Sequence, residues 1–307
     1  MTLSNTTARS APSLGGTIRG LLKTMRPKQW IKNGFVFLGL IFSDDRLFFS
    51  PVSFAKTLLA FAIFCLLSST VYLVNDIADI EKDRQHPRKR HRPLPAGKVK
   101  VWQAAALAIL LVALCIPAAF LLNPAFGVVA TAYLVIMMAY SFVLKHIVII
   151  DVFTIALGFV LRAMAGPLVL DIHVSPWLYV MTTLLALFLA LNKRRHELVL
   201  LNDSATHHRQ ILQEYSPRLL DQMIAVVTSS TVMAYCLYTF TAPNLPADHS
   251  MMLTIPFVLY GIFRYLYLVH QKNQGGSPDE IVVKDLPILI DVVLWGLSVL
   301  LILYVLR

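Results

Sequence analysis

Acidic side chains with a helical spacing follow the second long apolar run of the sequence. Residues 75–83 read Asn-Asp-Ile-Ala-Asp-Ile-Glu-Lys-Asp. If the apolar helix continues to Pro87, at about 100° per residue, one arc of about 100° holds an amide and three carboxylates. These residues are Asn75, Asp76, Asp79 and Asp83. Carboxylates this close repel one another unless a cation neutralises them, and their hard oxygen atoms suit Mg²⁺. The spacing therefore predicts a magnesium site with a catalytic role at these four residues; the alternative is a solvated acidic helix end.

A dense run of cations comes directly after these aspartates. Residues 86–97 combine arginines, a lysine and two histidines with prolines and a glycine. Taken alone, this run could bind nucleic acid or anionic lipid headgroups. Beside a magnesium site, closure over a phosphate-bearing substrate is the better interpretation, because Arg makes bidentate phosphate contacts and Lys supplies a point charge. We expect no nucleic-acid partner, and substrate contacts from His86, Lys89 and Arg92.

The elements that position these residues must lie in a membrane. Of the 307 residues, 57% are hydrophobic and 14% are charged, against about 25% charged in soluble proteins. Nine apolar runs each have about the 20 residues that a membrane-spanning helix needs. They cover approximately residues 30–49, 52–76, 101–122, 125–144, 147–170, 176–193, 219–242, 250–270 and 286–306. We predict an all-α integral membrane protein, with residues 1–16 as a flexible tail and residues 17–307 as one nine-span domain.

Basic residues orient these spans. The net charge is +10, and 23 of the 27 Lys and Arg residues fall in the tail and in loops on one side of the membrane, against three on the other. Because cytoplasmic loops carry the excess of Lys and Arg, we expect the N-terminus and the acidic site in the cytoplasm and the C-terminus outside. The same charge indicates contact with anionic membrane phospholipids. The oligomeric state stays open.

Two ionisable residues lie in the fifth run. Asp151 and Arg162 are eleven positions apart, so they share a helix face, and Arg162 falls near the middle of the membrane. A charge there costs at least about 2.5 kcal/mol and must face a polar environment. We interpret Arg162 as a cation that lines a cavity and binds substrate phosphate; the alternative is an arginine that hydrogen-bonds helix carbonyls. Tyr140 and Lys145, at the end of the fourth run, are further candidate substrate contacts, and Asp291 in the ninth run has no evident partner.

The acidic motif identifies a family. N-D-x-x-D-x-x-x-D followed by H-P-x-x-x-x-R-P resembles the first aspartate-rich motif of the UbiA-type membrane prenyltransferase superfamily, and nine spans match that fold. The segment Arg-Pro-Lys-Gln-Trp-Ile-Lys-Asn at residues 26–33 is similar to the one that precedes the first span in this family. The resemblance implies a helical bundle around a central cavity open to the cytoplasm. It also adds Lys28 and Lys32 to the expected substrate contacts.

The second motif departs from the aromatic prenyltransferases. Those enzymes carry D-x-x-x-D after the sixth span, where this sequence has Lys193 and Glu197, with Arg194 and Arg195 between them. This site should repel a metal ion and attract an anion, so we expect Lys193, Arg194, Arg195 and Glu197 to contact substrate. A positive-inside anchor is the alternative. The motif resembles the decaprenyl-phosphate phosphoribosyltransferase branch of the superfamily.

That branch implies a reaction. The donor would be phosphoribosyl pyrophosphate (PRPP), with Mg²⁺ as cofactor, and the acceptor a polyprenyl phosphate in a bacterial cytoplasmic membrane. The products would be polyprenyl-phosphoryl 5-phosphoribose, a precursor of cell-wall arabinan, and pyrophosphate. Two alternatives remain. A UbiA-type prenyltransferase would move an isoprenyl chain from its diphosphate to an aromatic or tetrapyrrole acceptor, and a lipid-phosphate transporter would explain the basic sites but not the aspartates.

Overall fold

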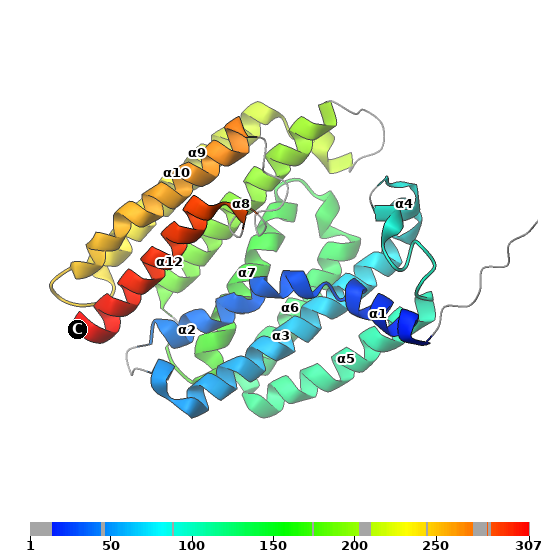
Figure 1. Ribbon diagram of the computed structural model, residues 1–307, viewed down its shortest axis with the longest axis horizontal. Coiled ribbons are helices and arrows are strands. Elements are labelled where there is room, and N and C mark those ends of the chain that lie inside the picture. Colours follow the sequence, from blue (N-terminus) through cyan, green and yellow to red (C-terminus); the bar gives the residue numbers. More distant parts are fainter. Residues whose placement is uncertain are drawn as a thin grey trace, which may run out of the picture.

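The computed structural model describes residues 14–43, 47–87, 89–173, 175–202, 210–243, 245–272, 281 and 284–306. Within them the chain is helical and forms an elongated bundle (Figure 1). The long helices are α3 (Pro51–Ala78), α5 (Val101–Leu122), α6 (Pro124–Phe142), α7 (Ile150–Val169), α8 (Pro176–Asn202), α9 (Pro217–Thr241), α10 (Ile255–Gln271) and α12 (Leu286–Leu301). The shorter ones are α1 (Leu14–Thr24), η1 (Pro27–Phe37), α2 (Leu38–Ile41), η2 (Leu47–Phe49), α4 (Ile80–Gln85), η3 (Lys89–His91), η4 (Leu144–His146), η5 (Gln210–Glu214), η6 (Ser250–Thr254) and η7 (Ile302–Leu306).

Local sequence signals start several of the long helices. Ser50, Asn123, Ser216 and Asp285 each precede a helix and accept a hydrogen bond from a backbone N–H of its first turn. A proline follows within two residues in each case, where its fixed φ suits the first helical positions and its missing N–H is not needed.

In the part of the chain that the structure describes, eight helices are long and apolar enough to cross a membrane. They correspond to the second to ninth expected spans. The first expected span, residues 30–49, is not a regular α-helix. Instead η1 is a 3₁₀ helix that leads into the four-residue α2. At about 2.0 Å and 1.5 Å per residue these two elements extend roughly 28 Å. Arg26, before η1, bonds Asp76 at one end of the bundle, and Ile41 accepts a hydrogen bond from Tyr304 at the other, so the segment runs the length of the bundle in a different conformation.

Helix α7 is the central element. It is the most buried of the eight candidate spans, and its residues belong to two separate apolar clusters. Val152 and Ala156 pack with α8, α9 and α10, whereas Leu161 and Ala165 pack with η1, α3, α5 and α6. Figure 1 shows α7 between these two halves. The site residues that α7 carries are therefore held from both sides.

Two further expectations concern the N-terminal tail and a central cavity. Helix α1 begins at Leu14, so residues 14–16 of the expected tail are helical, and residues 1–13 lie outside the described part of the chain. A cleft of about 500 Å³ opens between α9 and α10, where Asp221, Thr228, Tyr267 and His270 are among its lining residues. The expected central cavity open to the cytoplasm stays a prediction.

Candidate active site

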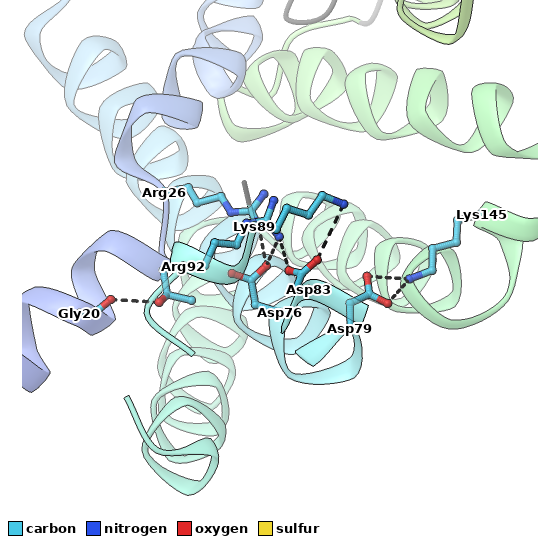
Figure 2. A network of polar contacts seen from close by, with 9 residues as sticks. Gly20, Arg26, Asp76, Asp79, Asp83, Lys89, Arg92 and Lys145 are labelled. Atoms are coloured by element: carbon cyan, nitrogen blue, oxygen red, sulfur yellow. Dashed lines mark hydrogen bonds and ion pairs between the residues drawn. The ribbon is translucent and has the colours of Figure 1, made fainter. Parts of the chain in front are cut away.

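The acidic motif sits where α3 ends. The expectation of one helix continuing to Pro87 is wrong: α3 stops at Ala78, Asp79 caps it, and α4 begins at Ile80. The backbone nevertheless keeps a helical hydrogen-bond pattern, because Asp79 N–H donates to Asn75 O at 2.9 Å and Asp83 N–H to Asp79 O at 2.8 Å. Asp76 and Asp83 face Arg92, whereas Asp79 faces Lys145 (Figure 2). The expected sharing of one face by these aspartates and Asn75 as a metal site stays a prediction.

Basic side chains from two segments, before η1 and around η3, neutralise Asp76 and Asp83, which are 1% and 3% exposed. Arg26 donates to Asp76 Oδ1 at 2.5 Å, and Arg92 lies 3.3 Å from the same oxygen and 2.6 Å from Asp83 Oδ2. The Lys89 ammonium is 3.8 Å from Asp83 Oδ1 (Figure 2). Buried carboxylates require such partners, because an uncompensated buried charge is strongly unfavourable.

Asp79 has a partner from another part of the chain. Lys145, in η4 after α6, places its ammonium 3.0 Å and 3.1 Å from the two carboxylate oxygens of Asp79. Lys145 is itself buried, at 6% exposure. The sequence prediction that Lys145 belongs to the site is compatible with this contact, since the lysine lies at the edge of the acidic motif (Figure 2).

Carboxylate oxygens are the ligands that a hard divalent cation prefers, and three carboxylates lie near the end of α3. As arranged, each carboxylate faces a basic side chain. Within the described residues no group of three or more His, Cys, Asp or Glu side chains is close enough to hold a metal ion. A metal bound here would have to take over oxygens that Arg26, Arg92 and Lys145 now contact, and those cations would then face its phosphate ligands.

Arg26 was not among the predicted site residues. It joins α1 to η1 with a φ of +54°, and its guanidinium also lies 4.7 Å from the centre of the Tyr72 ring. It begins the basic segment that holds the expected substrate contacts Lys28 and Lys32. Lys28 is exposed and Lys32 is half-buried along η1. Sequence spacing could not select Arg26, because its contact depends on a left-handed backbone residue that only the fold reveals.

The second motif lies at the same end of the bundle, on α8. Arg194 is 2% exposed, and its guanidinium forms hydrogen bonds with other residues of the protein. Its Nε donates to Asp151 Oδ2 at 2.7 Å, Nη1 to Glu197 Oε2 at 2.5 Å, and Nη2 to the Tyr140 hydroxyl at 3.3 Å. The predicted residues Arg194, Glu197 and Tyr140 are thus brought together, but Arg194 faces two carboxylates and not open space.

The neighbouring cations are more accessible. Lys193 approaches Glu197 at 4.0 Å with 43% of its side chain exposed. Arg195 pairs with Asp221 of α9. Among the three basic residues of this motif, Lys193 therefore offers the most exposed charge. His86 holds the loop after α4, where its Nδ1 accepts from Lys89 N–H at 3.3 Å.

Arg162 occupies a neutral network in the middle of α7. Its Nε donates to Asn33 Oδ1 at 2.7 Å, Nη1 to Gly158 O at 2.7 Å and Nη2 to the Tyr133 hydroxyl at 2.6 Å. At 7% exposure Arg162 is enclosed. Its hydrogen bond to the Gly158 carbonyl is the helix-carbonyl contact of the alternative interpretation.

Two carboxylates that lie within predicted spans, those of Asp151 and Asp291, have different surroundings. Asp151, on the same face of α7 as Arg162, pairs with Arg194 instead. Asp291 of α12 is 8% exposed and faces Gly261 of α10.

Comparison with known proteins now identifies the fold and the lineage. The UbiA prenyltransferase family matches residues 34–279 of the chain. The chain belongs to this family. It is accordingly a multi-pass membrane protein of the UbiA type. UbiA homologues from Archaeoglobus fulgidus bound to DMAPP and Mg²⁺ and to GPP and Mg²⁺ superpose with TM-scores of 0.70 and 0.69, at 19% and 18% identity. Each covers 93% of this chain, and 99% and 100% of those chains are matched. At this identity the likeness shows the fold alone.

Sequence relatives are nearer. The chain is 32% identical over 291 residues to the decaprenyl-phosphate phosphoribosyltransferase of Corynebacterium glutamicum, covering 93% of this chain and 87% of that one. It is 34% identical over 280 residues to the protein of the same name from Mycolicibacterium smegmatis, covering 87% of both. The resemblance predicted from the two motifs, to the UbiA superfamily and to this branch of it, is confirmed.

Proposed function

We propose that this protein transfers 5-phosphoribose from PRPP to a polyprenyl phosphate and releases pyrophosphate. The observation that carries the proposal is the composition of the second motif. Where a carboxylate pair would hold a metal, the chain has Lys193 exposed at the surface and Arg194 buried between Asp151 and Glu197. The accessible ammonium of Lys193 suits a monophosphate anion. The two phosphoribosyltransferases named above match 93% and 87% of this chain.

The first motif would bind the donor. Asp76, Asp79 and Asp83, with Asn75 beside them, would hold Mg²⁺, which when bound supplies positive charge at the pyrophosphate leaving group. The basic side chains that now neutralise the aspartates would contact the phosphate oxygens of PRPP as the metal takes the carboxylates. They are Arg26, Lys89, Arg92 and Lys145. Such prearranged charges stabilise the negative charge that develops as the ribose C1–O bond breaks.

The second motif would bind the acceptor. A lipid phosphate is already ionised at neutral pH, so its oxygen can attack ribose C1 without a general base, and catalysis is mainly positioning. Lys193 would contact this phosphate, and we assign further contacts with it to Arg195 and Lys32. The residues that would line the site without contacting the phosphate directly are Arg194, Tyr140 and Glu197. Direct displacement should invert the anomeric centre.

The chemistry also requires an orientation. PRPP and Mg²⁺ are soluble, so the end of the bundle that carries both motifs must face the compartment that supplies them. The basic residues near this end support a cytoplasmic location in a bacterial inner membrane. The N-terminus would then be cytoplasmic and the C-terminus outside, with residues 17–307 as one membrane domain.

The test uses purified full-length protein with two substrate pairs. The first pair is radiolabelled PRPP with decaprenyl phosphate and Mg²⁺; the second is decaprenyl diphosphate with 4-hydroxybenzoate and Mg²⁺. We expect label from PRPP to enter the lipid fraction with the first pair, and no decaprenyl diphosphate to be consumed with the second. Consumption of the diphosphate without transfer from PRPP would replace the proposal by aromatic prenyl transfer. No chemistry with either pair, together with flux of lipid phosphate across vesicles, would favour a transporter.

A further inference from the structure

The turn between α6 and α7 contains a strained residue at the junction of the two motifs. Ile149 has a φ of +69° and a ψ of −46°, and Ile150 N–H donates to Val148 O at 2.8 Å, which closes a γ-turn around it. A β-branched residue rarely adopts positive φ, because its side chain clashes with the backbone. Such a conformation persists only where surrounding contacts hold it.

Tyr215 supplies those contacts from the segment between η5 and α9. Ile149 N–H donates to the Tyr215 hydroxyl at 2.7 Å, and that hydroxyl donates to Asp151 Oδ1 at 2.8 Å. Tyr215 is 4% exposed and Asp151 is fully enclosed. Burial raises the pKa of Tyr215 to about 12, so the hydroxyl keeps its proton at neutral pH. One hydroxyl thus bonds both sides of the strained turn.

The same turn carries side chains into both motifs. Lys145, four residues before Ile149, contacts both oxygens of Asp79 in the first motif. Asp151, two residues after Ile149, accepts from Arg194 in the second motif. A change of backbone conformation at Ile149 would therefore displace the ammonium that lies against Asp79.

We propose that Tyr215 is a positioning residue: by holding the strained turn at Ile149 it keeps Lys145 against the acidic motif. Tyr215 lies 66 residues from Ile149 along the chain and belongs to neither motif. The identity of the affected substrate, PRPP, rests on the proposed function. The backbone effect does not, because it is a property of the protein without substrate.

The experiment compares Tyr215→Phe with wild type in detergent. Loss of the hydroxyl leaves a buried N–H and a buried carboxylate oxygen one hydrogen bond short. We expect the KM for PRPP to rise about tenfold and amide exchange in residues 145–151 to quicken by a similar factor. Tyr235→Phe is the matched control, because Tyr235 is also buried and its hydroxyl bonds Thr254 and Trp295 in another part of the bundle. It should lower thermal stability comparably while the KM for PRPP and this exchange stay at wild-type values.

A second substitution separates positioning from simple stabilisation. Glycine adopts positive φ without steric clash, and Ile149 is 43% exposed, so Ile149→Gly relieves the turn at little packing cost. In the Tyr215→Phe background it should restore the KM for PRPP to within about threefold of the Ile149→Gly single variant. If Tyr215→Phe does not fold, the double variant is measured in its place and should fold.

The KM and exchange measurements accept or reject the positioning role of Tyr215. Wild-type KM and exchange in Tyr215→Phe, or a loss that Ile149→Gly does not restore, would overturn the inference, as would a double variant that fails to fold. If wild type does not use PRPP at all, the proposed function fails. The exchange comparison, which needs no substrate, then still accepts or rejects the role of Tyr215.

Discussion

Replacing Arg194 by methionine tests whether its guanidinium is an internal partner or a substrate contact. Methionine keeps much of the length and the apolar stem but removes the charge and all donors. Asp151, fully enclosed, would then keep the Tyr215 bond and lose its counter-ion. Removing one partner of a buried ion pair costs about 3–5 kcal/mol, because the remaining charge has no compensation.

The second partner of Arg194 adds little to this estimate. Glu197 has 30% of its side chain exposed, so water screens its pair with Arg194, and a pair of this kind contributes less than about 1 kcal/mol. The expected loss therefore comes mainly from Asp151. A double variant in which Asp151→Leu accompanies Arg194→Met removes both buried charges, and its stability should lie well above that of Arg194→Met alone.

The assay measures thermal unfolding of the four proteins in one detergent, together with the KM for polyprenyl phosphate. We expect a large loss of stability in Arg194→Met, partial recovery in the double variant and a strong coupling between the two positions. Unchanged stability in Arg194→Met with a large rise in the KM for the lipid would refute the reasoning. It would show that Arg194 contacts the lipid phosphate directly, as the sequence alone had indicated.

Three further changes address the metal, the acceptor site and pH. Asp76→Asn should lower turnover at least about 10²-fold without unfolding the protein, and EDTA should have the same effect on wild type; full activity in chelator would exclude the metal role. Lys193→Asp should lower phosphoribosyl transfer roughly 10²-fold, because a repulsion replaces a charge-assisted contact, whereas Lys193→Arg should retain most activity; equal losses in both would argue against a charge effect. The hydrogen bond from Arg264 lowers the pKa of Asp285. That stabilisation is complete above the unfolded-state pKa of about 4 and is lost as pH falls through the lower folded pKa. Asp285→Asn should therefore lower the free energy of unfolding at pH 7 by less than about 1 kcal/mol, and the difference in stability from wild type should vanish towards pH 3. A difference that stays constant with pH would contradict this account.

Much of the architecture was predictable from composition and spacing. In hydrocarbon every backbone polar group must be hydrogen-bonded inside the protein, and a continuous run of about 20 apolar residues achieves this within itself as a helix. Within the described residues, eight of the nine expected spans accordingly appear as long helices. The first could not be predicted in detail. Its conformation as a 3₁₀ helix goes with close packing against α7, where any side chain at Gly166 would collide with the backbone of Val36.

The acidic motif could also be predicted from the sequence. Asp76, Asp79 and Asp83 lie within one or two helical turns, so their relative directions follow from local geometry. Their partners could not be predicted in this way. Arg26 and Lys145 reach them across 50 and 66 residues of chain, and Asp151 meets Arg194 across 43. Periodicity places residues on a face of one helix but carries no information on which helix that face meets. For this reason the sequence determined that the second motif is cationic, and only the packing of α7 against α8 decided that its central arginine is neutralised from within.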